Sequence, residues 1–170
     1  MTTTFDITPH IARQLRAFQS DKHEMFSYVQ FNAATRAAYA INDRYAIRIP
    51  LTKAPTDTFE MRLPSAVKSF SEPEKLVTID PDRGRITHDD VILEASMREP
   101  LIVDPDDWFF PSTTQGKTVT NAINSNHLRD VLRVFGRAET EIIIYATTPT
   151  VITSANELYK NWRVVMAPYN

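Results

Sequence analysis

Hydrophobic residues recur every three or four positions in three segments of the chain and alternate with polar residues in most of the others. The helical spacing predicts helices at 9–19, 64–71 and 125–135, and each starts at a Pro or a Ser/Asn pair that suits a first helical turn. The alternating segments predict strands at 25–32, 37–41, 45–49, 76–79, 85–87, 91–97, 141–145, 150–153 and 162–166. The pattern therefore predicts an α+β chain rich in antiparallel sheet.

A weak repeat divides the chain into strand-helix-strands units. Thr4-Phe5-Asp6-Ile7 comes before Pro9, and Thr58-Phe59-Glu60-Met61 comes before Pro64, so both copies run from a short strand into a helix. A third copy is expected at Val119 to Ile123. Breaks fall at 51–58, which contains Pro55, and at 111–117, where Ser, Thr and Gly gather. We expect a two-unit domain over 1–115 and a third unit over 116–170.

Composition limits the class of protein. With 42% hydrophobic and 24% charged residues in 170, the chain is expected to fold as a globular protein. It contains no cysteine, which excludes disulfides, thiolate catalysis and thiolate zinc sites. No apolar run approaches the roughly 20 residues of a membrane span, and the N-terminus lacks the features of a signal peptide. A cytoplasmic location is the resulting expectation.

Residues that could carry chemistry are scattered. The 4 histidines form no spacing typical of a metal or protease site, and His88-Asp89-Asp90 is predicted to be a solvated turn. The acidic run at 104–107 lacks the glycine and terminal glutamate of a calcium-binding loop. The 3 glycines lie too far apart to form a phosphate-binding loop. We therefore expect a protein that is not an enzyme and that holds no metal or other cofactor.

Positive charge is concentrated near two of the predicted helices. His10–Lys22 and Asn126–Ala138 each carry a formal charge of +2, so the remainder of the chain carries -6. The basic residues are Arg13, Arg16 and Lys22 near the first helix, and Arg129, Arg133 and Arg137 along the third. The apolar spacing of both helices places them away from the core, where they could hold a phosphate backbone without reading bases. Ordinary solvated arginines are the alternative interpretation.

Three segments resemble the bacterial DNA polymerase III beta subunit, the DNA sliding clamp. Ser125-Asn126-His127-Leu128-Arg129-Asp130-Val131-Leu132 and the later Val164-Val165-Met166 are similar to the family's "Leu-x-Asp-Val-Leu" helix and "Val-Val-Met-Pro" strand, although Ala167 here precedes Pro168. Ala40–Ala46 resembles "Ala-Thr-Asp-Gly-His-Arg-Leu-Ala" without its Gly-His pair, and Val103–Asp107 is similar to a "Phe-Pro-Asp-Tyr" turn. The segments follow one another in the family's order.

The resemblance implies a DNA-clamp-like fold with antiparallel sheets and helices on one face. In the family, the helices line the hole of a ring around duplex DNA, and a pocket between domains docks a short peptide. Carried over by position, the peptide-binding residues here would be Asp43, Arg44, Tyr45, Pro105, Phe110, Thr150, Val164, Met166 and Pro168. The alternative is that several of these are core residues of the sheets.

Two functions remain open. The first is a sliding-clamp-like processivity or scaffold protein that self-associates around duplex DNA, without sequence specificity, and docks a DNA polymerase or other clamp-binding proteins. The second is a clamp-like adaptor or decoy that binds replication proteins without encircling DNA. A family chain has three domains of two units each, whereas this sequence shows three units in all, and that difference motivates the second.

Overall fold

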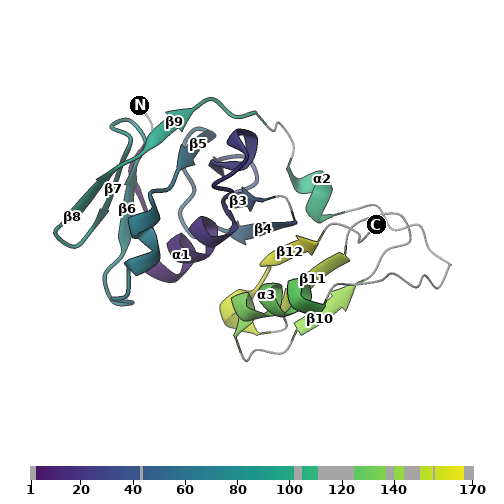
Figure 1. Ribbon diagram of the computed structural model, residues 1–170. Coiled ribbons are helices and arrows are strands. Elements are labelled where there is room, and N and C mark those ends of the chain that lie inside the picture. Colours follow the sequence, from purple (N-terminus) through teal and green to yellow (C-terminus); the bar gives the residue numbers. More distant parts are fainter. Residues whose placement is uncertain are drawn as a thin grey trace.

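The computed structural model describes residues 3–42, 44–101, 105–110, 125–136, 140–143, 150–154 and 156–166, with only the backbone described at 141–143 (Figure 1). These residues form short helices and antiparallel sheets. The predicted α+β class is therefore confirmed.

The first unit contains one helix and four strands. Its elements are β1 (Phe5–Ile7), α1 (Pro9–Phe18), the 3-10 turn η1 (Glu24–Phe26), β2 (Val29–Asn32), β3 (Ala37–Ile41) and β4 (Tyr45–Pro50). The side chain of Thr8 caps α1 by accepting a hydrogen bond from the Ile11 amide, and Pro9 suits the first turn. The predicted helix at 9–19 is confirmed, whereas the predicted strand at 25–32 is shortened by η1.

The second unit departs from prediction twice. Its elements are β5 (Phe59–Arg62), the 3-10 helix η2 (Ser65–Ser69), β6 (Val77–Asp80), β7 (Arg85–His88), β8 (Val91–Glu94) and β9 (Ser96–Arg98). The expected helix at 64–71 is only η2, which buries Val67 alone and so lacks the apolar stripe of a longer helix. The expected strand at 91–97 divides at Ala95, whose amide donates to the Gly84 carbonyl. A Cβ at Gly84 would lie 2.8 Å from the Ala95 oxygen, and its φ of +59° also favours glycine.

The last part of the chain contains the remaining elements. They are α2 (Asp106–Phe109), α3 (Ser125–Phe135), β10 (Thr140–Ile143), β11 (Thr150–Ser154), the 3-10 turn η3 (Glu157–Tyr159) and β12 (Arg163–Met166). The helix predicted at 125–135 is confirmed, and α2 was not predicted. The third copy of the repeat, predicted at 119–123, lies outside the described residues.

The sheets show how the third unit joins the first. One sheet has the order β1-β6-β7-β8, and the other has the order β10-β11-β12-β4-β3-β2-β5-β9. Strand β12 pairs antiparallel with β4, so that Arg163 lies opposite Arg48 and Met166 lies opposite Tyr45. The last strands of the chain therefore extend the sheet of the first unit. The division at residues 115 and 116 stays a prediction.

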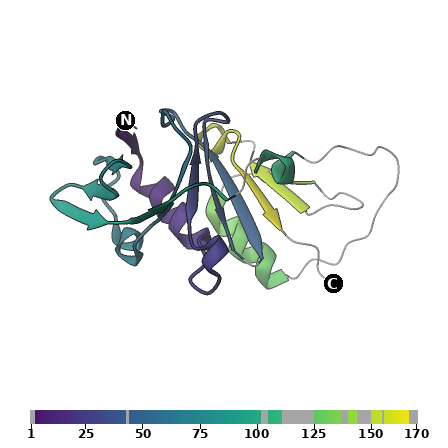
Figure 2. The ribbon, with the colours of Figure 1, turned by 90° about the horizontal axis from the view of Figure 1, so that it is seen from above.

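The two longer helices cover one face of the eight-stranded sheet (Figure 2). Leu15 of α1 and Val131 of α3 are fully buried in one core with Ile47 and Val164 of the sheet. Burying one such side chain contributes roughly 1.5–3 kcal/mol. Helix α2 lies on the opposite face, where Phe109 packs in a second cluster. The expectation of helices on one face holds for α1 and α3 but not for α2.

Candidate functional site

The seam between β4 and β12 gathers three of the residues predicted to bind a peptide. Tyr45 lies opposite Met166, and Met166 lies opposite Thr150 on β11, so the three side chains point to the helix-covered face at one end of the seam. The Tyr45 ring is half-buried and contacts the rings of Phe18 and His127 edge-on, at centroid distances of 5.9 and 5.7 Å. Thr150 and Met166 are buried. Tyr45 is thus the accessible member of this group.

Among the other predicted peptide-binding residues, only Val164 lies beside that group, two residues before Met166 on the same face. Val164 is fully buried on the helix face, while Pro105 and Phe110 flank α2 on the opposite face. Arg44 is exposed just before β4, and Asp43 and Pro168 lie outside the described residues. The described residues of the predicted pocket therefore lie on two faces of the sheet, because α2, which Pro105 and Phe110 flank, crosses the seam on the face opposite Tyr45 and Met166.

Polar contacts hold α2 across the seam on the sheet face opposite α1 and α3. Asp106 Oδ1 accepts hydrogen bonds from the Tyr39 hydroxyl and from Arg48 Nε, the latter at 2.8 Å. Burial, followed by the hydrogen bond to Asp106, raises the pKa of Tyr39 to about 12. Arg48 is itself buried, so the Asp106 carboxylate supplies the partner that a desolvated cation requires.

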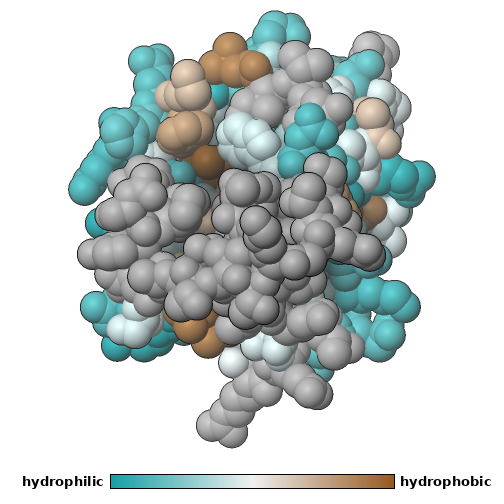
Figure 3. All heavy atoms as spheres, turned by 90° about the vertical axis from the view of Figure 1, so that its right-hand side faces the viewer, coloured by the Kyte–Doolittle hydropathy of each residue, from teal (hydrophilic) through white to brown (hydrophobic). Residues whose placement is uncertain are grey.

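Residues at the end of α2 also contact β12. Arg163 Nη1 donates to the Phe109 carbonyl at 3.3 Å, and the guanidinium groups of Arg48 and Arg163 lie 5.2 and 4.1 Å from the centre of the Phe110 ring. Phe110 thus contacts both strands of the seam. Figure 3 views this side of the molecule, where the described surface is largely hydrophilic with a smaller hydrophobic group near the top. The sequence signal for these contacts was one arginine in each of two otherwise apolar strands, Arg48 within β4 and Arg163 at the start of β12.

The predicted DNA-binding residues fall into two classes. Arg129 and Arg133 on α3 are exposed, as is Lys22 after α1, and Arg137 lies outside the described residues. Arg133 lies 3.5 Å from Asp130, in an exposed pair that leaves it accessible. These three basic residues could meet a phosphate backbone.

Arg13 and Arg16 differ from that class. Arg16 is buried and bonds Asp21 Oδ1 at 2.7 Å, so the prediction that it faces outward is wrong. Its Nε and Nη1 atoms are buried with no partner among the described residues. Arg13 is half-buried and donates to the Phe70 carbonyl. The physical reason is that η2 packs against α1 and covers a side of the helix that apolar spacing alone leaves open.

Solved structures share this architecture. A protein from Eubacterium rectale assigned as a DNA polymerase III beta subunit superposes with a TM-score of 0.69 over 99% of this chain, at 12% identity. The DNA polymerase III beta chain from Streptococcus pneumoniae superposes with a TM-score of 0.66 over 99%, at 14% identity. The chain has the fold of a DNA polymerase III beta subunit. The predicted resemblance is confirmed at the level of the fold.

The beta-subunit fold is present here at reduced length. This chain spans 66% and 65% of the length of those two solved chains. No model of a known protein family matches the sequence, and no curated protein does.

Within this beta-subunit fold, two strands at opposite ends of the molecule are sheet edges (Figure 1). Strand β8 is the edge of the four-stranded sheet, and its Val91 and Ile92 are 47% and 61% exposed. Strand β10 is an edge of the eight-stranded sheet. Exposed apolar edges invite pairing with another chain.

In the part of the chain that the structure describes, no three His, Asp or Glu side chains come close enough together to hold a metal ion. His88 is buried on β7 with its ring centre 4.5 Å from that of Phe70, so the prediction of a solvated turn is wrong for this residue. None of the described helices has the length and hydrophobicity of a membrane-spanning segment.

Proposed function

We propose that this chain is a sliding-clamp-like processivity or scaffold protein that self-associates around duplex DNA and docks replication proteins. The observation that carries the proposal is the match of its fold to DNA polymerase III beta subunits over 99% of the chain. The role is non-catalytic, which is consistent with the clamp-like fold.

The proposed DNA contact is the helix-covered face. Arg129, Arg133 and Lys22 are exposed there and would neutralise phosphates without reading bases. Arg137 extends the same row in the sequence. Arg16 is left out of the proposed surface because it is buried and bonded to Asp21.

The proposed self-association uses the edge strands β8 and β10. Pairing β8 of one copy with β10 of the next would be a head-to-tail contact, which closes into a ring when the rotation per copy allows it. The exposed Val91 and Ile92 would be covered in that contact. The proposed docking point for a replication protein is the Tyr45 end of the seam, beside the exposed Arg44.

The decisive experiment measures assembly and topology together. Light scattering coupled to size exclusion, at two protein and two salt concentrations, should give a closed oligomer of defined mass. The protein should then be retained on nicked circular DNA and lost after the DNA is linearised. A strictly monomeric protein at micromolar concentration, or equal retention on both DNA forms, would overturn the proposal.

A matched pair of variants tests the interface. Ile92→Lys places a charge on the β8 edge, and it should shift the protein toward monomer without unfolding it, because Ile92 is 61% exposed. Met25→Lys is the control, since Met25 is 60% exposed and lies outside β8 and β10, the two strands of the proposed contact. Equal effects of the two variants would count against the β8 interface.

The second candidate is an adaptor or decoy that binds replication proteins without enclosing DNA. The observation that favours it is that Arg16 is buried and bonds Asp21, and Arg13 donates to the Phe70 carbonyl, which removes two of the predicted DNA contacts. It predicts a monomer that still binds a clamp-binding protein, with binding reduced by Tyr45→Ala and no retention on circular DNA.

A further inference from the structure

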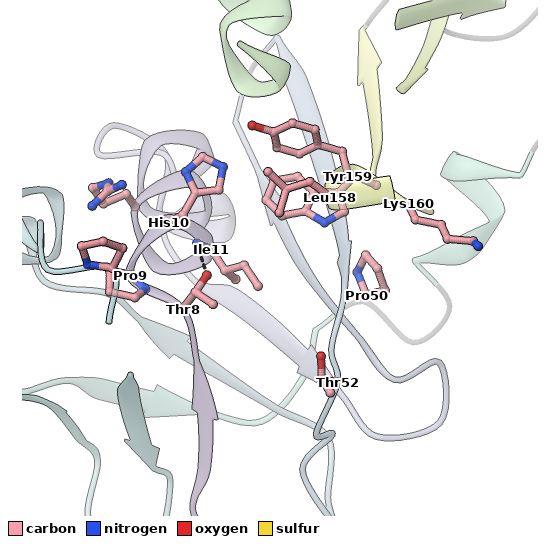
Figure 4. Close-up of a pocket in the computed structure, with 12 residues that line it drawn as sticks. Thr8, Pro9, His10, Ile11, Pro50, Thr52, Leu158, Tyr159 and Lys160 are labelled. Carbon is pink, nitrogen blue, oxygen red and sulfur yellow. Dashed lines mark hydrogen bonds between the residues drawn. The ribbon is translucent and has the colours of Figure 1, made fainter. Parts of the chain in front are cut away.

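A cavity lies at the end of the β4–β12 seam away from Tyr45 and Met166. Its volume is about 540 Å³, within the range of small-molecule sites. Its lining comes from the start of α1, the end of β4, the loop before β6, and η3 with the following residues. The lining residues are Thr8, Pro9, His10, Ile11, Arg13, Pro50, Thr52, Pro73, Leu158, Tyr159, Lys160 and Trp162. Figure 4 shows the α1 residues facing those of η3 and β4 across it.

One part of the cavity wall is apolar and already fixed in position. The rings of His10 and Trp162 stack with centroids 5.6 Å apart, and Tyr159 meets both rings edge-on. Trp162 is only 5% exposed, so it offers no open platform on which a nucleobase could stack. Leu158 is 73% exposed at the rim, where it could cover an aliphatic or small aromatic group.

The polar part of the wall favours an anion. No lining residue is acidic, the first turn of α1 contains no acidic residue, and Arg13 contributes positive charge although its Nη1 already donates to the Phe70 carbonyl. His10 Nε2 is buried with no hydrogen-bond partner among the described residues. Burial, and then the charge of Arg13, lower the pKa of His10, so the positive charge of Arg13 acts on this part of the wall. Lys160 adds little, because its ammonium bonds Glu157 and points away from α1 (Figure 4).

From these contacts we infer that the cavity binds a small organic carboxylate, with the carboxylate beside His10 and Arg13 and an apolar group against Pro50 and Leu158. This chemistry is shared by a free acid and by an acidic residue next to an apolar one in a peptide. The site is separate from the proposed peptide-docking end of the seam and does not depend on DNA encirclement.

The test uses the 2 tryptophans of the chain as reporters. In nitrogen-15-labelled protein, the indole signal of Trp162 reports on the cavity, and that of Trp108 on α2 is the internal control. The first probe is 4-phenylbutyrate, with neutral 4-phenylbutanamide as its matched control. The acid should shift the Trp162 signal saturably with a Kd of about 1 mM, leave Trp108 unchanged, and bind at least about tenfold more tightly than the amide.

Two variants that each add one carboxylate, one in the cavity lining and one elsewhere, test whether the cavity binds an anion. Thr52→Asp adds a carboxylate at an exposed lining position and should weaken binding of the acid at least about tenfold. Ser96→Asp adds the same charge on β9, away from the cavity, and should change nothing. Equal binding of acid and amide, no shift of Trp162 at about 10 mM probe, or equal effects of the two variants would overturn the inference.

A second arm identifies the source of the carboxylate. The blocked tripeptide acetyl-Gly-Glu-Phe-amide is compared with its glutamine analogue by the same Trp162 signal. Tighter binding of the glutamate peptide than of 4-phenylbutyrate supports a peptide segment as the ligand. Tighter binding of 4-phenylbutyrate supports a free acid, and binding of neither overturns the site.

Discussion

Helices α1 and α3 share a sequence pattern and cover the same face of the sheet, yet their arginines lie in different environments. On α3, Arg129 and Arg133 are exposed. On α1, Arg16 is 5% exposed and bonds Asp21, and Arg13 donates to the Phe70 carbonyl. Both helices nevertheless bury an apolar stripe in one continuous core. The spacing of apolar residues therefore shows which side of a helix packs on its sheet, and not whether another element covers the remaining side.

The largest expected effect on stability comes from substitutions in the core that α1 and α3 share. Leu15→Ala on α1 and Phe135→Ala on α3 each remove a fully or almost fully buried side chain and should lower the free energy of unfolding by about 2–5 kcal/mol. If the two helices stabilise one body, urea unfolding of each variant should remain a single transition at a lower midpoint. A separate early transition in Phe135→Ala alone would show instead that the third unit unfolds independently.

The next largest effect on stability is expected at Arg16, the buried arginine of α1. Asp21→Asn leaves the Arg16 guanidinium without its carboxylate and should cost about 1–3 kcal/mol of unfolding free energy. Arg16→Met removes the cation together with its two unpartnered nitrogens, and should cost less than Asp21→Asn or stabilise the protein. Urea midpoints measure both changes. A larger loss in Arg16→Met would show that the ion pair is stabilising on its own.

A smaller effect on stability is expected for the exposed arginines of α3. Arg129→Gln with Arg133→Gln should change stability by less than about 0.5 kcal/mol, since both side chains are exposed. It should reduce the salt dependence of duplex DNA binding by about 0.9 in logarithmic slope per arginine. Arg83→Gln is the matched control, because Arg83 and Arg133 are 73% and 72% exposed and each pairs with an aspartate three residues earlier. An equal effect of this control would indicate nonspecific attraction.

The smallest effect is a pH dependence at the start of α1. Burial and the charge of Arg13 lower the pKa of His10 below its ordinary 6.5, so the unfolded chain binds the proton more readily than the folded one. Stability should be unaffected by His10 above pH 6.5 and should fall as the pH decreases below that value. His10→Gln should lack this loss, whereas the exposed His23→Gln should retain it. Equal pH profiles in all three proteins would contradict the assignment.

Most elements could be predicted because their signals are local. Thr8 and Pro9 mark the start of α1, and the apolar spacing of Leu128, Val131 and Phe135 marks α3. The division between β8 and β9 could not be predicted, since it depends on a hydrogen bond between Ala95 and the distant turn at Gly84. Local sequence does not contain such a contact.

The candidate site was predictable in outline only. Tyr45, Thr150 and Met166 come together as the family resemblance implied, but Phe110 lies on the other face because α2 crosses the seam there. Neither the burial of Arg16 nor the cavity beside His10 follows from spacing, since each is formed by elements distant in sequence. Whether the predicted residues bind DNA or a peptide stays a prediction.

The pairing of β4 with β12 also bears on the order in which a growing chain can fold. Arg48 emerges from the ribosome long before its opposite residue Arg163, so one side of β4 has no β12 beside it until the later strand has been made. The nascent protein therefore carries an open, largely hydrophobic strand that only the last stretch of the described chain can cover. Slow translation between these two strands would prolong that exposure and favour aggregation, whereas rapid translation would protect against it.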